Sequence, residues 1–184
     1  MFTTLRNAWK IPELRKKILF TVFALLIFRL GSVVPVPFID SNMLGATLNN
    51  MGGIFTLLGA MNGTAFSMAA VFALGVQPYI NSSIIIQLLT VAIPALERLQ
   101  KEGGEEGRKK IAAITRYVTV AIGLLQGFGY YTLIRTQGGG TMLDTAGLPG
   151  WWAGIVIVLC FTAGSAFVMW LGEQITEFGI GNGI

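Results

Sequence analysis

Long apolar stretches separated by short polar segments dominate the hydropathy pattern of this chain. A helix needs roughly 20 apolar residues to cross a hydrocarbon core about 30 Å thick. Four stretches reach or approach that length, at residues 18–35, 69–96, 111–134 and 151–171. The pattern predicts an all-α membrane protein, a polytopic helical bundle with four transmembrane helices.

The fourth stretch has aromatic residues at both ends and small residues at its centre. Trp151, Trp152 and Trp170 are placed as anchors at two membrane surfaces. The small residues at 163–166 (Ala-Gly-Ser-Ala) would let a neighbouring helix approach closely. A local run of small residues without a partner is the alternative.

The second stretch holds more polar and helix-breaking residues than contact with lipid requires. They are Gly75, Gln77, Pro78, Asn81, Ser82, Ser83 and Gln87. Pro78 has no N–H to donate, so we expect the helix to kink there. At about 100° per residue, one narrow arc of the helix is apolar near mid-depth and polar toward one end; it holds Val76, Ile80, Ser83 and Gln87. Such a face suits either a funnel wall with an apolar constriction or hydrogen bonding between packed helices.

A shorter apolar segment lies between the first two stretches, at residues 49–67. Its apolar centre is about half the length needed to cross a bilayer, and Gly52, Gly53 and Gly63 bracket it. Such a segment is either a surface loop or a re-entrant helix that lies in protein at membrane depth. The pattern leaves both open.

Lysine and arginine residues gather on one side of the predicted spans. Segments 1–17 and 97–110 are basic, whereas residues 30–68 contain no Lys or Arg. The N-terminus, the 97–110 loop and the connection at 172–184 are therefore expected in the cytoplasm. Arg29 lies inside the first stretch, where snorkelling to the surface and pairing with another group are both open.

The basic N-terminal segment is long, and no small-x-small cleavage site follows the first apolar stretch, so we expect no cleaved signal peptide. Phe2, Leu5 and Trp9 fall at helical spacing. They suit an interfacial helix on an anionic leaflet, with a disordered basic tail as the alternative.

Composition argues against an enzyme. Of 184 residues, 53% are apolar and 12% charged, there is no histidine, and Cys160 is the single cysteine. Gly103, Gly104 and Gly107 lack the Gly-Lys-Ser/Thr ending of a phosphate-binding loop. We find no catalytic constellation, and we expect no metal and no cofactor.

Several ordered runs resemble one family. The run ALGVQPYINSSIIIQLL at residues 73–89 resembles the second transmembrane helix of SecY-type protein-conducting channels. Loop residues 101–103 (KEG) and 107–110 (GRKK) fit the same family. Residues 169–177 (MWLGEQITE) and 179–184 (GIGNGI) resemble its segment between the fourth and fifth helices, with Phe178 where a basic residue is expected.

The resemblance implies a ten-helix channel in two inverted halves of five. This chain would form most of one half of that two-halved channel, and segment 49–67 would hold a short re-entrant plug helix. The whole protein would be the central channel subunit of the general secretory translocase, a multi-pass protein of the bacterial plasma membrane. It would pass unfolded preproteins across the membrane and release transmembrane segments laterally into lipid.

The resemblance also assigns roles to particular residues. Val76 and Ile80 would belong to the pore ring, and Ser83, Ile84 and Gln87 to the lateral gate that contacts signal sequences. Arg108, Lys109 and Lys110 would make cytoplasmic contacts. The plug would comprise Gly53, Ile54, Phe55, Thr56, Leu57, Leu58, Gly59, Ala60, Met61 and Asn62.

The implied partners are SecE-type and SecG-type membrane subunits, a SecA-type motor ATPase, translating ribosomes, signal peptides and nascent chains, anionic lipids, and the remaining helices of the same channel. Two rival classes stay open. A secondary transporter is disfavoured because none of the four stretches contains Asp or Glu. An anchoring subunit without conduction is the second rival, since half a ring cannot enclose a pore.

Overall fold

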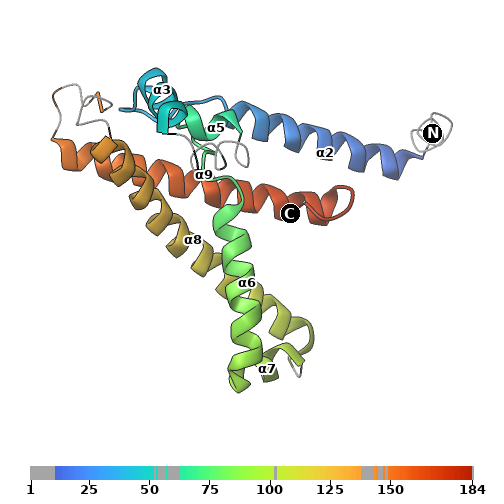
Figure 1. Cartoon of the computed structure of the whole chain (residues 1–184). Helices are drawn as coiled ribbons and strands as arrows, with labels where there is room; N and C mark the ends of the chain where they lie inside the picture. The colour runs from blue at the N-terminus through green and yellow to red at the C-terminus, as the bar shows by residue number, and fades with distance from the viewer. Residues whose placement is uncertain are drawn as a thin grey trace.

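The computed structural model describes residues 11–51, 53, 57, 63–101, 103–137, 143–144, 147 and 149–183. Regular structure in these ranges is helical, which confirms the all-α prediction (Figure 1). The helices are α2 (Pro12–Gly31), α3 (Ser41–Met51), α5 (Thr64–Ser67), α6 (Gln77–Ala92), α7 (Pro94–Lys101), α8 (Gly104–Gln137) and α9 (Gly150–Phe178).

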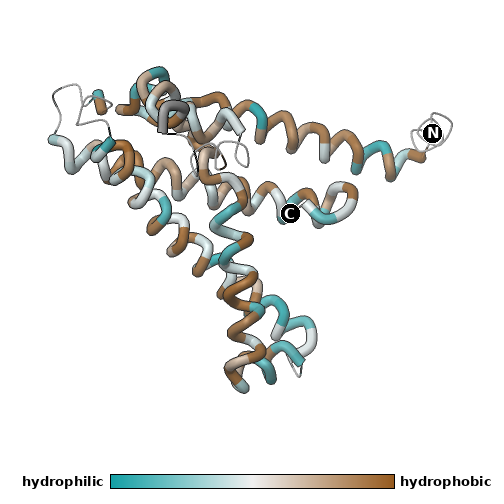
Figure 2. The backbone as a smooth tube through the Cα atoms, in the orientation of Figure 1, coloured by the Kyte–Doolittle hydropathy of each residue, from teal (hydrophilic) through white to brown (hydrophobic). Residues whose placement is uncertain are grey.

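The two longest helices, α8 and α9, cross each other, and other helices pack against them (Figure 1). α6 and α7 pack on the first part of α8, and α2 extends along α9. α3 and α5 lie near the end where α8 finishes and α9 begins. Figure 2 shows apolar residues along much of α2 and α6, and hydrophilic ones where α7 meets α8.

Small residues allow the closest contacts between these elements. A methyl group at Gly123 of α8 would lie 3.0 Å from the Ser165 hydroxyl of α9. A methyl group at Gly164 would overlap the carbonyl oxygen of Val71, in the segment before α6. The prediction that residues 163–166 admit a close neighbour is confirmed, and they have two neighbours, α8 and the chain at Val71.

The second apolar stretch is not one kinked helix over residues 69–96, so that prediction was wrong in two places. Residues 69–76 form turns, and α6 begins at Gln77 with Pro78 in its first turn. A proline is well placed there, because the first N–H groups of a helix have no intrahelical partner to lose. The bend comes instead at Ile93, where Pro94 follows and α7 turns by 101°.

α2 begins six residues before the predicted start of the first span and ends at Gly31. Pro12 occupies its first turn, so residues 12–17 of the predicted basic tail are helical. The interfacial helix expected around Phe2, Leu5 and Trp9 lies outside the described residues.

By length and composition, two described helices, α8 and α9, can cross a membrane, and the bent pair α6–α7 makes a third if it is one span. α2 falls outside this group because Arg15, Lys16, Lys17 and Arg29 lie within its 20 residues. These charges stand near its two ends, where they can snorkel. A first span at 18–35, and with it the total of four, stays a prediction.

We predict that Gly164→Ala lowers the stability of the full-length protein, because the added methyl group would overlap the Val71 carbonyl oxygen. Overpacking of this kind costs about 1–3 kcal/mol. The matched control is Gly129→Ala on α8, where an added methyl group meets nothing within 4 Å. The thermal unfolding midpoint in detergent should fall for Gly164→Ala and hold or rise slightly for the control. Equal midpoints for the two variants would contradict the close contact.

Candidate functional site

The chain before α6 is held in place by its backbone. The Val36 amide donates to the Ala69 carbonyl at 2.9 Å, and the Val71 amide donates to the Val34 carbonyl at 2.9 Å. Ala69, Ala70 and Ala73 are fully buried. We call residues 69–73, with their two hydrogen bonds to Val34 and Val36, the seat of α6. The seat fixes where α6 starts, and therefore which side chains its first turns expose.

One cavity of about 490 Å³ opens beside the start of α6. Its lining comes from α2, from the chain around α5 and from residues 72–80. The residues are Phe28, Arg29, Ser32, Gly63, Thr64, Ala65, Phe72, Gly75, Val76, Gln77 and Ile80. The structure thus brings Val76 and Ile80, the two residues expected in a pore ring, to one surface. We call this space the first cavity.

Arg29 lines the first cavity from the last turn of α2. A cation at a helix C-terminus is favoured by the helix dipole. Its side chain is exposed, and the described residues place no carboxylate within ion-pair distance of it. Of the two alternatives for Arg29, pairing therefore finds no acidic partner in the part of the chain that the structure covers.

A second cavity of about 460 Å³ lies between α6, α8 and the end of α9. It is lined by Tyr79, Ser83, Arg116, Glu173, Thr176, Glu177 and Asn182. Arg116 donates from Nε to Glu173 Oε1 at 2.8 Å, which ties α8 to α9 across this space. The lining is polar and charged, in contrast to Val76 and Ile80 in the first cavity.

The arc predicted on α6 is therefore divided between two cavities. Val76 and Ile80 belong to the first, and Ser83 to the second. The opposite face of α6 is the packed one, with Pro78, Ser82, Ile86 and Thr90 buried. The predicted change from apolar to polar along the arc agrees with this division.

Three polar side chains of α6 donate hydrogen bonds within their own helix. Ser82 donates to the Pro78 carbonyl at 2.7 Å, and Gln87 Nε2 donates to Ser83 Oγ at 3.3 Å. Thr90 donates to the Gln87 carbonyl at 2.7 Å. The alternative of hydrogen bonds between packed helices thus does not account for Ser82, Ser83 and Gln87. The side chains of Ile84 and Gln87 are exposed.

Only two of the residues assigned to the plug, Gly53 and Leu57, are described. Both are exposed, and the Leu57 amide donates to the Gly53 carbonyl at 3.2 Å, as in a helical turn. The other eight lie outside the described residues: Ile54, Phe55, Thr56, Leu58, Gly59, Ala60, Met61 and Asn62. The next described residue is Gly63, which has φ +67° and lines the first cavity.

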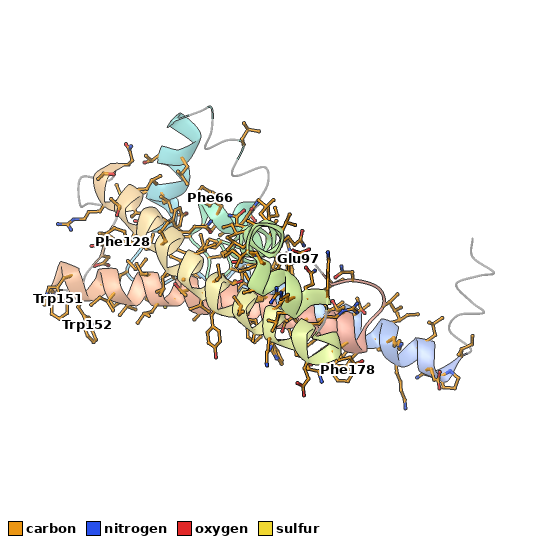
Figure 3. The ribbon with its side chains drawn as sticks, turned by 90° about the horizontal axis from the view of Figure 1, so that it is seen from below. Phe66, Glu97, Phe128, Trp151, Trp152 and Phe178 are labelled. Carbon is orange, nitrogen blue, oxygen red and sulfur yellow. The ribbon has the colours of Figure 1, made fainter. Side chains whose placement is uncertain are left out.

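Tyr130 of α8 anchors the short helix that follows Gly63. Its buried hydroxyl donates to the Phe66 carbonyl in α5, and its ring centre lies 4.8 Å from that of Phe66. The Phe161 ring of α9 meets Tyr130 edge-on at 5.0 Å. Phe66, labelled in Figure 3, is thereby fixed to α8, and Tyr130 links it in turn to Phe161 of α9. Sequence reasoning missed Tyr130, because no local pattern marks a hydrogen bond to a carbonyl 64 residues away.

The predicted loop at residues 97–110 is mainly helical, which corrects its description as a loop. α7 and α8 meet at a tight turn, and methyl groups at Gly103 or Gly107 would overlap the Leu99 carbonyl oxygen. Close packing therefore explains Gly103 and Gly107, whereas Gly104 has a φ of +54°, which favours glycine. Glu97 in α7 accepts a hydrogen bond from Lys101 at 2.6 Å, and this bond and its negative charge raise the pKa of Lys101. Arg108, Lys109 and Lys110 are exposed on the first turns of α8.

Among the described residues, no group of three or more His, Cys, Asp or Glu could hold a metal ion. Fold and site together define a class: an all-helical membrane protein in which one half-exposed helix, α6, borders two cavities, one with Val76 and Ile80 in its wall and one that holds an Arg–Glu ion pair.

Comparison with known proteins identifies the family. A family model described as SecY matches residues 70–184. Protein translocase subunit SecY of Streptomyces coelicolor is 43% identical over 194 residues, a match that covers 100% of this chain and 44% of that protein. The subunit of the same name from Bacillus subtilis is 40% identical over 185 residues and 42% covered. That of Thermus thermophilus is 42% identical over 182 residues, covering 96% of this chain and 40% of that protein. The chain belongs to the SecY family, and it spans less than half the length of these relatives.

A solved structure shares the fold. Sec61 in the canine ribosome-channel complex from the endoplasmic reticulum superposes with a TM-score of 0.61 over 97% of this chain and 38% of the Sec61 chain. At 16% identity, this likeness concerns the fold alone. The resemblance noted in the sequence is confirmed at the level of the family.

We predict that Tyr130→Phe destabilises the full-length protein, since the buried Phe66 carbonyl would lose its side-chain donor. The carbonyl would keep the Ala69 amide as a donor at 3.2 Å, so the loss is that of one hydrogen bond, about 0.5–1.5 kcal/mol. Tyr131→Phe is the matched control, because the Tyr131 hydroxyl is 3.4 Å from the Gly150 carbonyl and makes a weaker bond. Amide hydrogen exchange should quicken at residues 64–67 in Tyr130→Phe only. Faster exchange there in both variants, or in neither, would contradict the anchoring role.

Proposed function

We propose that this chain is the front part of the central channel subunit of the general secretory translocase. The whole protein would pass unfolded preproteins across the bacterial plasma membrane and release transmembrane segments laterally into lipid. One observation carries the proposal: in a chain of the SecY family, Val76 and Ile80 line one cavity of α6 while Ser83 lines the next. In the assembled channel, these apolar side chains would narrow a path that continues past the polar Ser83, as a gated conduit needs.

Val76 and Ile80 would supply part of the constriction. Apolar side chains offer no hydrogen bonds, so a sliding polypeptide is not trapped there, and a narrow apolar passage resists wetting when it is empty. The missing half of the channel would complete the ring. The driving energy would come from partners, since sequence motifs for nucleotide binding were not found.

The exposed face of α6 beyond the constriction would form one side of the lateral gate. Ile84 is 51% exposed, with Ser83 and Gln87 beside it, whereas Ile86 on the other face is 4% exposed. A signal sequence docking here would replace helix contacts with its own apolar surface. Ser83 and Gln87 bond to each other, which lowers the cost of covering them with an apolar ligand.

The segment from Gly53 to Asn62 would act as the plug on the outer side. The support is its attachment: Gly63, at its end, lines the first cavity together with Val76 and Ile80. Tyr130 holds the following helix, so movement of the plug would leave residues 64–67 in place.

The distribution of Lys and Arg supports a cytoplasmic N-terminus and a multi-pass topology. Arg108, Lys109 and Lys110 would then face a SecA-type motor or a translating ribosome, and the Sec61 neighbour was solved in a ribosome complex. SecE-type and SecG-type subunits, signal peptides and nascent chains are the further partners we propose.

The test places a photocrosslinking residue at position 80 of the full-length channel, in membranes that hold a stalled secretory polypeptide. Ile80 is 40% exposed and lines the first cavity, so an adduct with the polypeptide is expected. The matched control is position 86, on the same helix but buried against the bundle. There the crosslinker should react with the channel itself.

The adduct at position 80 should also require a functional signal sequence. If position 80 reacts only with neighbouring helices, this face of α6 is a packing surface and the pore assignment fails. An adduct at position 80 that forms equally without a signal sequence would contradict the gating role.

A further inference from the structure

A groove on the outside of the α8–α9 pair belongs to neither cavity of α6. It has a volume of about 400 Å³. Its lining is Leu124, Phe128, Tyr131 and Arg135 from α8, with Trp151, Gly154, Ile155, Val158 and Leu159 from α9. The lining is apolar and aromatic apart from one cation.

The floor of the groove is built by one close contact. A methyl group at Gly154 would lie 2.7 Å from the Tyr131 ring, so glycine lets this buried ring lie against α9. Leu124, Leu159 and Phe128 remain exposed along the walls. Figure 3 shows Trp151 and Trp152 at the start of α9 and Phe128 on the neighbouring α8.

The groove is polar at one end only. Arg135 lies two residues before the end of α8, and Trp151 lies in the first turn of α9. Both helices can cross a membrane, and tryptophans gather where hydrocarbon meets headgroups. The cationic end therefore lies at a membrane surface. Arg135 is exposed, and the described residues offer it no carboxylate at ion-pair distance.

The length of the groove matches one leaflet. Leu124 and Arg135 are 11 positions apart, which corresponds to about 16 Å along a helix. Half of a hydrocarbon core is about 15 Å. The groove thus runs from the headgroup region to about the middle of the bilayer.

We propose that this groove binds a phospholipid with a net negative headgroup, one acyl chain lying between α8 and α9 and the phosphate next to Arg135. Charge complementarity supports the headgroup, and the apolar walls support the chain. A transmembrane helix about 10 Å wide and as long as the groove would need roughly 1,200 Å³, about three times the volume found. With the N-terminus in the cytoplasm, the lipid would come from the outer leaflet. The site requires only that α8 and α9 span the membrane, and so stands apart from the channel function.

The test uses the full-length channel in nanodiscs of phosphatidylcholine with a fraction of phosphatidylglycerol, and counts retained lipids by native mass spectrometry. The wild-type protein should retain phosphatidylglycerol over phosphatidylcholine by about fivefold, the factor for an ion pair of about 1 kcal/mol. Arg135→Gln should bring this ratio close to one, and Arg135→Lys should restore most of it.

A second pair of variants tests the groove itself. Leu124→Trp places a ring in the groove and should lower retention of both lipids. Leu125→Trp adds the same ring at the neighbouring position, which is 74% exposed and outside the groove, and should match the wild-type protein. A ratio near one in the wild-type protein, or an unchanged ratio in Arg135→Gln, overturns the anionic headgroup. Equal retention by both tryptophan variants overturns the groove as the binding place.

A photocrosslinker at Leu159 separates a lipid from a partner helix. An adduct with lipid supports the proposal. An adduct with another membrane protein instead of lipid makes the groove a subunit interface and overturns it.

Discussion

The position of α6 in the bundle depends on how closely the chain before it can approach α9. Gly164 has no side chain, so the Val71 carbonyl oxygen can lie directly against the helix backbone. This contact sets the depth at which α6 begins, and two backbone hydrogen bonds to residues 34 and 36 set its direction. Val76 and Ile80 come only a few residues later. Their position beside the first cavity is therefore a consequence of one missing methyl group, since a larger residue would push the start of α6 away.

The same seat explains why α6 can remain half-exposed. Its packed face needs only small groups and one isoleucine, Ser82, Ile86 and Thr90, to lie against the bundle. The hydroxyls on that face bond to backbone carbonyls of their own helix, so they make no demand on a neighbour. Because α6 is held at both ends and the hydroxyls of its packed face are satisfied within the helix, its other face is free to line the two cavities. The first cavity, to which α6 contributes Val76 and Ile80, and the second, to which it contributes Tyr79 and Ser83, follow one another along this exposed face.

The sequence predicted helix type, the small-residue contact and the change of polarity along α6, because each of these follows from local composition and spacing. It misplaced three helix boundaries at prolines. Pro78 was read as a kink although it stands where a helix can start, and Pro94, which does end α6, was passed over. Pro12 likewise began α2 earlier than hydropathy suggested. Tyr130 and the Arg116–Glu173 pair could not be found, since both join residues more than 50 positions apart and leave no periodic trace.

The bend at Ile93 has a mechanical consequence. α7 packs closely on α8 where Gly103 and Gly107 leave room for the Leu99 carbonyl. The C-terminal end of α6 is therefore attached to α8 through this short helix. α6, which is about 24 Å long, is therefore fixed at both of its ends. A force on Ile84, near the middle of α6, or on Ile80, in its first turn, is transmitted to α8 and to the seat at Val71, because α6 has no free end that could bend away. Sideways movement of α6 therefore requires that either its contact at Val71 or its attachment to α8 through α7 is broken.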